Sequence, residues 1–177
     1  MKKLVVVLAV MFLGSFAVPR TADAILISGS TGYSGIGDFS ADVDWEVFAP
    51  GDPTSYLVPS GFYDYFYVIT NTSTPSLANS IWSFSIGNPS STPVTSAGFL
   101  ETGGVDPSLF FIDPAGTSFL FIPFLGGPIA SGSSSDRLYL TSLYPPASVP
   151  GGLLALGGAS GTESLPGPVI PEPATMA

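Results

Sequence analysis

Three acidic residues at alternating positions come closest to a chemical site in this sequence. Asp42, Asp44 and Glu46, with Asp38 nearby, alternate with apolar residues, so in a β-strand the three carboxylates would share one face. Paired carboxylates can act as acid and base in glycoside hydrolysis, and hard carboxylate oxygens also suit Ca²⁺. Carboxylates on the polar face of a strand are most often simply solvated, so we expect neither catalysis nor a metal site from them.

The residue types used by most other enzymes are missing. The sequence has no His and no Cys, which excludes Ser-His-Asp and Cys-His nucleophiles and zinc sites built on those ligands. Its two lysines, Lys2 and Lys3, lie in a segment that we expect to be removed, which excludes Schiff-base chemistry. We therefore expect a protein that is not an enzyme and that has no cofactor.

Three tyrosines form a candidate binding site. Tyr63, Tyr65 and Tyr67 lie in the aromatic and β-branched run 62–70 and would face one side of a strand. Each ring offers an apolar body with a polar tip, so exposed rings could form a platform for sugars. The other face of the run is apolar too, which is typical of a strand buried on both sides. Burial of the three rings is thus the favoured expectation, and a glycan-binding platform is the alternative.

The elements that would position these residues are short strands. The sequence contains 21 Gly and 18 Pro with only 10% charged residues, a composition that interrupts every helical window. Turn clusters separate apolar or alternating runs, and the stretch 28–37 is expected to be a Gly-rich turn. This rhythm predicts an all-β fold, an antiparallel two-sheet sandwich or jelly roll of eight or nine strands. The expected strands cover residues 25–27, 42–47, 62–70, 81–86, 96–101, 109–112, 118–124, 137–143 and 153–156.

The N-terminus has the features of a secretory signal peptide over residues 1–24. A basic start precedes an apolar run, 4–16, that is shorter than the ~20 residues of a membrane span. Ala22 and Ala24 are the small residues that signal peptidase requires, so the mature chain is expected to begin at Ile25. Residues 25–164 are then expected to form one domain, and residues 165–177 an extended linker.

The charge of the mature chain excludes several classes of partner. The sequence has 4 basic and 13 acidic residues, and Lys2, Lys3, Arg20 and Asp23 lie in the leader. The remainder, 1 basic and 12 acidic residues, has a net charge of −11. A chain whose one cation is Arg137 cannot neutralise a row of phosphates, so nucleic acid is excluded as a partner. Anionic lipid surfaces are disfavoured for the same reason.

The last residues carry a recognisable motif. Pro171, Glu172 and Pro173 follow Ile170 and precede Ala174 and Thr175, and this segment resembles the start of a PEP-CTERM sorting signal. The aromatic run before Asn71 and the segment 138–146 also look like those of family members. The resemblance implies export by the general secretory route, processing by an exosortase, and association with the cell envelope or an extracellular polysaccharide matrix of a Gram-negative bacterium.

The family's tails continue into a hydrophobic helix and a short basic cluster. The sequence reaches Ala177 before either feature, so transient membrane anchoring is expected only if such a helix follows. The function expected from the resemblance is structural or adhesive. The alternatives are a carbohydrate-binding module that uses the tyrosine platform and, third, a carboxylate-dependent glycoside hydrolase.

Overall fold

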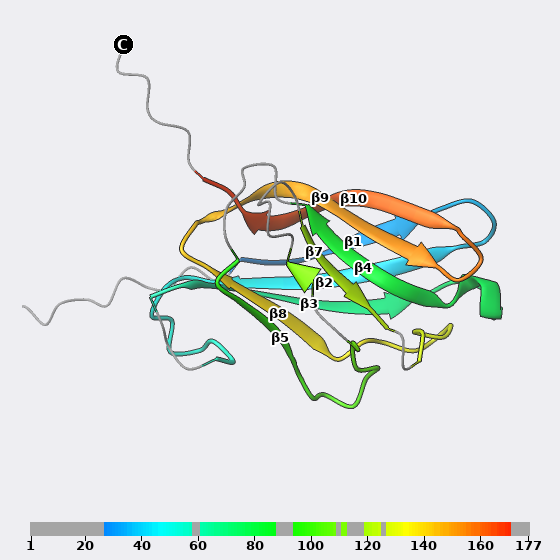
Figure 1. The fold of residues 1–177 in the computed structure, drawn as a ribbon, viewed down its shortest axis with the longest axis horizontal. Coiled ribbons are helices and arrows are strands. Elements are labelled where there is room, and N and C mark those ends of the chain that lie inside the picture. The colour runs from blue at the N-terminus through cyan, green and yellow to red at the C-terminus, as the bar shows by residue number, and fades with distance from the viewer. Residues whose placement is uncertain are drawn as a thin grey trace, which may run out of the picture.

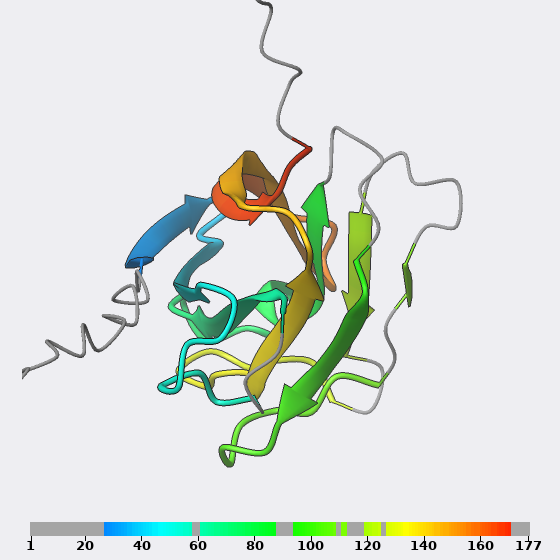
Figure 2. The same ribbon diagram turned by 90° about the vertical axis from the view of Figure 1, so that its left-hand side faces the viewer.

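The described residues form a sandwich of two antiparallel five-stranded sheets, which confirms the all-β fold class (Figures 1 and 2). Within them the only helix is a single 3₁₀ turn, η1 (Leu77–Asn79). None of their helices is long and apolar enough to cross a membrane. The computed structural model describes residues 27–57, 61–87, 94–108, 111–112, 119–124 and 127–170.

The chain crosses repeatedly between the two sheets, so half of the neighbouring strand pairs join strands that are not consecutive in sequence. The first sheet contains β1 (Ile27–Ser34), β2 (Ser40–Phe48), β3 (Tyr63–Asn71), β8 (Arg137–Ser142) and β5 (Ser96–Leu100), in that order. The second contains β10 (Ser160–Pro168), β9 (Pro146–Ala155), β4 (Ile81–Gly87), β7 (Phe119–Pro123) and β6 (Phe111–Ile112). The edge strands β1 and β10 contact each other along one side of the sandwich (Figure 2).

The core between the sheets is built from one face of each. Tyr65 and Tyr67, with 0% and 2% of their surfaces exposed, are with Tyr33 its largest side chains, and Tyr63 is half-buried against the same core. The glycan-platform hypothesis is therefore wrong, because the second sheet covers these rings. The buried core side chains are Tyr33, Phe39, Ala41, Val43, Val47, Tyr65, Tyr67, Ile69, Ile81, Phe84, Ile86, Phe124, Ile129, Leu138, Leu140, Val149, Leu153, Ala155 and Leu165.

The buried hydroxyls of Tyr67 and Tyr33 differ in whether they have a hydrogen-bond partner. Tyr67 Oη donates to the carbonyl of Pro166 in the opposite sheet at 2.6 Å, whereas Tyr33 Oη is buried without a hydrogen-bond partner. Tyr67→Phe should therefore lower the free energy of unfolding by about 1 kcal/mol, because it removes a formed bond. Tyr33→Phe should leave that free energy unchanged or raise it, since it removes an unpaired polar group.

Urea unfolding of the two variants beside the wild type checks this pair of expectations. Both substitutions remove one oxygen atom and keep the ring, so each serves as the control for the other. An equal loss of stability in both variants would contradict the assignment of the hydroxyl partners.

The Gly-rich stretch after Ile27 is a strand rather than the expected turn. Residues 27–34 pair with β2 over their whole length, and Gly29 lies opposite Trp45. A Cβ at Gly29 would lie 2.5 Å from Cζ2 of Trp45, so the indole ring occupies the space that a side chain would need. The turn is confined to the following residues, where Gly37 and Asp38 adopt left-handed backbone conformations.

The domain extends beyond the expected boundary at residue 164. β10 continues to Pro168, Leu165 is buried in the core, and Val169 packs against it. The expected linker is thus wrong for residues 165–168. Prolines suggested a linker, but β10 is an edge strand, where a residue without an N–H group can be accommodated.

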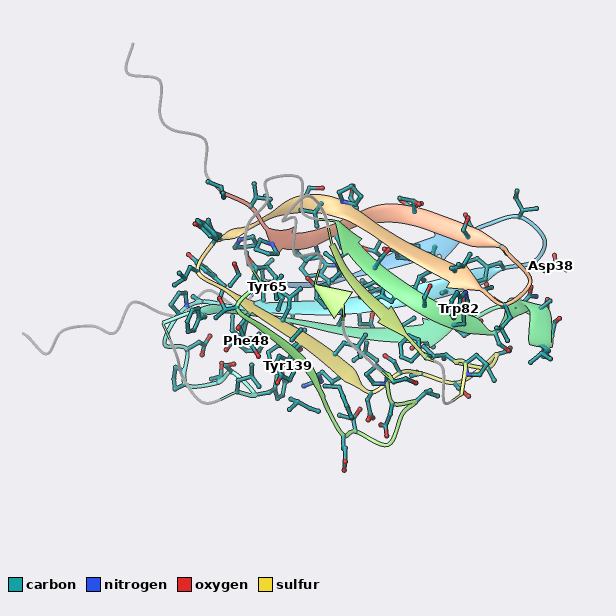
Figure 3. All side chains as sticks on the ribbon, in the orientation of Figure 1. Asp38, Phe48, Tyr65, Trp82 and Tyr139 are labelled. Atoms are coloured by element: carbon teal, nitrogen blue, oxygen red, sulfur yellow. The ribbon has the colours of Figure 1, made fainter. Side chains whose placement is uncertain are left out.

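A β-bulge changes the face of one tryptophan. Strict alternation along β4 would place Trp82 on one face with Phe84 and Ile86, but the register of β4 against β9 shifts between Ile81 and Ser83. Ile81 is buried in its place, and Trp82 is only half-buried (Figure 3). The inserted residue reverses the alternation of the side chains before it.

Candidate functional site

A second apolar cluster lies on the outer face of the first sheet. This outer aromatic cluster consists of Phe48 on β2, Phe66 on β3, Tyr139 on β8 and Tyr56 from the β2–β3 loop. Tyr56 contacts Phe48 and Phe66 edge to face, with ring centroids 5.5 and 5.1 Å apart. Phe48 and Phe66 are buried by this arrangement. β3 is therefore buried on both faces, as its apolar pattern predicted.

Arg137, the one basic residue beyond residue 20, borders this cluster. Its guanidinium carbon lies 3.8 Å from the centroid of the Tyr56 ring, which is a cation–π contact. Tyr139, two residues along β8, lies over Gly98 of β5, where a Cβ would be 2.5 Å from the tyrosine oxygen. The cluster thus fixes a guanidinium at one place on the outer face, beside a tyrosine that is 48% exposed.

A groove of about 430 Å³ runs across the strands of this outer face beside the aromatic cluster. Asp44 and Glu46 lie on its β2 wall, Ser28 and Ser30 on β1, and Phe66 and Val68 on β3, with Arg137 at the β8 side. The ladders place these residues in two rows: Ser28, Glu46 and Phe66 are consecutive across three strands, and so are Ser30, Asp44 and Val68. The groove therefore combines carboxylates, hydroxyls, a guanidinium and apolar surface.

Glu46 has an unusual environment within the groove. Its side chain is only partly exposed, and Oε2 is buried without a hydrogen-bond partner. A carboxylate oxygen that is removed from water without a donor is unfavourable. The groove consequently presents an acceptor whose hydrogen-bonding capacity is open to a ligand.

The structure places three of the expected carboxylates on one face of β2 and the fourth, Asp38, outside that strand. Asp42 and Asp44 are exposed on the outer face of β2, and Glu46 follows them along the strand. Asp38 lies in the β1–β2 turn at the opposite end of the molecule from Phe48 and Tyr139 (Figure 3). Among the described residues no three acidic side chains lie close enough together to hold a metal ion. Alternate residues of a strand are ~7 Å apart, and calcium binding by Asp42, Asp44 and Glu46 stays a hypothesis from the sequence.

A pair of buried carboxylates under the β2–β3 loop was missed by the sequence interpretation. Asp64 is 2% exposed; its Oδ2 accepts a 2.6 Å hydrogen bond from Ser55 Oγ, and its Oδ1 has no partner. Burial raises the pKa of Asp64, the Ser55 bond lowers it, and the charge of Asp52 raises it further. Asp52 in turn accepts bonds from the amide and hydroxyl of Thr54. These contacts hold the loop that brings Tyr56 to Arg137.

Asp136, immediately before β8, organises a second loop. Its Oδ1 accepts hydrogen bonds from the amides of Thr102 and Gly104, both at 2.8 Å, and from the Thr102 hydroxyl at 3.1 Å. Burial acts to raise the pKa of Asp136, but a hydrogen bond from Asp106 and those from the loop outweigh burial and lower it. This carboxylate is a structural acceptor rather than part of the groove.

Most residues of the two terminal signals predicted from the sequence lie outside the described residues. Ala22, Ala24 and Ile25 lie outside the described residues, and so do the motif residues 171–175. Ile170 is the last described residue and is 38% exposed. The predicted signal-peptide cleavage and sorting motif stay predictions.

The fold and the groove define a class of protein: an antiparallel β-sandwich with a polar and aromatic groove on one outer face. No protein-family model matches the chain, and no curated protein matches it with significant similarity.

Proposed function

We propose that this protein is an exported, non-enzymatic β-sandwich with a structural or adhesive role, sorted by its PEP-CTERM-like tail to the cell envelope or to an extracellular polysaccharide matrix. The observation that carries the proposal is the short distance along the chain between the folded domain and the motif. β10 ends at Pro168, and the Pro-Glu-Pro motif begins at Pro171. Two prolines favour an extended backbone, which suits recognition by a processing enzyme.

The placement of the acidic residues supports a role without catalysis. The buried carboxylates Asp52, Asp64 and Asp136 each accept hydrogen bonds from neighbouring loop residues. Asp42 and Asp44 are exposed on a strand face. With no His or Cys in the sequence, an adhesive domain accounts for these residues with fewer assumptions than a hydrolase does.

Expression of the gene with its natural downstream sequence in a Gram-negative host that carries an exosortase tests the sorting proposal. Wild-type protein should be cut near Pro171 and recovered from the envelope or matrix. The double variant Pro171→Ala/Pro173→Ala should remain uncut and change its location. Thr162→Ala, an exposed change on β10, is the matched control and should behave as wild type. Cell fractionation and mass spectrometry of the C-terminus provide the readouts, and identical location and C-termini in all three proteins would refute the proposal.

A further inference from the structure

We propose that the groove on the outer face of the first sheet binds a polymer of amino sugars, whose ammonium groups pair with Glu46 and Asp44. The inference rests on the proposed adhesive role and gives that role a ligand class. It is carried by the combination of groups that the groove presents: an acceptor without a partner, a second carboxylate, hydroxyls and an apolar surface.

The carboxylates of β2 favour a positively charged hydrogen-bond donor in the ligand. Oε2 of Glu46 is buried and has no hydrogen-bond partner. Asp44, two residues before Glu46, lies on the same outer face of the strand. A charge-assisted hydrogen bond from an ammonium group would satisfy that oxygen better than a neutral hydroxyl would. The long-range field acts in the same direction, because residues 25–177 carry a net charge of −11 and attract cations. Anionic polymers such as polyuronates are repelled by the same charge.

The other groups of the groove distinguish an amino sugar from a simple cation. Ser28 lies directly opposite Glu46, and Ser30 opposite Asp44, so a hydroxyl that can donate or accept flanks each carboxylate. On the other side of β2, the half-buried Val68 supplies apolar surface against which the C–H groups of a sugar ring can pack. An amino sugar has ammonium, hydroxyl and C–H surface on one ring.

Arg137 determines which way round such a ligand lies in the groove. Its guanidinium is held on Tyr56 at the β8 end of the groove, where it repels an ammonium group and can donate to ring or linkage oxygens. The ammonium group is thereby confined to the β2 wall, beside Glu46 and Asp44.

Isothermal titration of the exported chain with a glucosamine hexamer tests the proposal, with the N-acetylglucosamine hexamer and hexalysine as comparison probes. At mildly acidic pH and low salt, the glucosamine hexamer should bind at least about tenfold more tightly than either comparison, since only it offers both ammonium and sugar groups. Equal binding of the acetylated hexamer would overturn the role of the ammonium. Equal binding of hexalysine would overturn the role of the sugar ring.

Three single variants locate the site. Glu46→Gln and the exposed Asp44→Asn should each weaken binding of the glucosamine hexamer about tenfold. Asp42→Asn removes the same charge from the same face of β2 outside the groove, and should weaken binding by about twofold at most. Equal losses in all three variants would show non-specific attraction and overturn the site.

Unchanged melting temperatures would show that the variants are folded. Failure of binding is distinguishable from failure of the proposed sorting, because cleavage and location in cells are measured without the sugar.

Discussion

Asn71→Ala is expected to lower the free energy of unfolding by about 3–5 kcal/mol. Asn71 is fully buried at the end of β3. Its Nδ2 donates to the carbonyls of Asn79 at 2.9 Å and Ile129 at 2.8 Å, and its Oδ1 accepts from the amide of Ser73 at 3.0 Å. Alanine would leave the carbonyls of Asn79 and Ile129 and the amide of Ser73 without this partner, along with a cavity.

Equilibrium denaturation by urea measures the effect. Asn79→Ala is the matched control, because the hydrogen bonds of the Asn79 side chain to Thr74, at 3.2 and 3.4 Å, are exposed. That control should change the free energy of unfolding by less than about 0.5 kcal/mol. Similar losses in the two variants would show that the bonds of Asn71 do not stabilise the sandwich.

The second large loss of stability is expected on replacing Asp136. Asp136→Ala should lower the free energy of unfolding by about 3 kcal/mol at neutral pH. The reason is that the amides of Thr102 and Gly104 and the Thr102 hydroxyl lose a charged acceptor. Glu101→Gln, an exposed change in the same loop, should have little effect. The loop should also become more accessible to hydrogen exchange in the alanine variant.

The loss at Asp136 should depend on pH in a defined direction. The pKa of Asp136 is lowered in the folded protein, so its contribution is complete above the ordinary value of about 4 and is lost as pH falls through the lowered pKa. The difference in stability between wild type and Asp136→Ala should therefore shrink below about pH 4. The pKa of Asp106 is raised, mainly by its hydrogen bond with Asp136 and then by burial. The stability from that bond is lost as pH rises through the raised pKa of Asp106, so around and above about pH 4 it acts against the trend expected from Asp136. A difference that stays constant down to strongly acidic pH would contradict the stated role of the carboxylate.

The sequence predicted the strands whose side chains follow a regular pattern. The alternation of Asp42–Val47 and the apolar run of β3 identify strands close to the observed β2 and β3. Most of β1 and all of β10 were missed because glycines and prolines have low strand propensity by themselves. Their conformations depend on partners distant in sequence: Trp45 fills the space above Gly29, and β9 pairs with β10 along its whole length. Tertiary contacts therefore override local preference in both strands.

The groove could be predicted only in part. The carboxylates of β2 were recognisable from their spacing, but the positions of Tyr56 and Arg137 depend on how a loop folds back over the sheet. A local signal did exist at Asp64, since a lone acidic residue within an otherwise apolar run indicates a specific hydrogen-bonded environment. The apolar pattern favoured burial of the three tyrosines but left an exposed platform open, because sequence periodicity shows which residues share a face and not what covers that face.

The order of the strands has a consequence for how the protein reaches its compact form. β4 ends at Gly87, yet its partner β9 begins only at Pro146, and β10 completes that sheet at the very end of the domain. During synthesis from the N-terminus, β4 has no β9 to pair with until residues 146–155 have been made. Such pairing between remote segments is intrinsically slow. Completion of the second sheet therefore waits until the last strands of the domain have been synthesised.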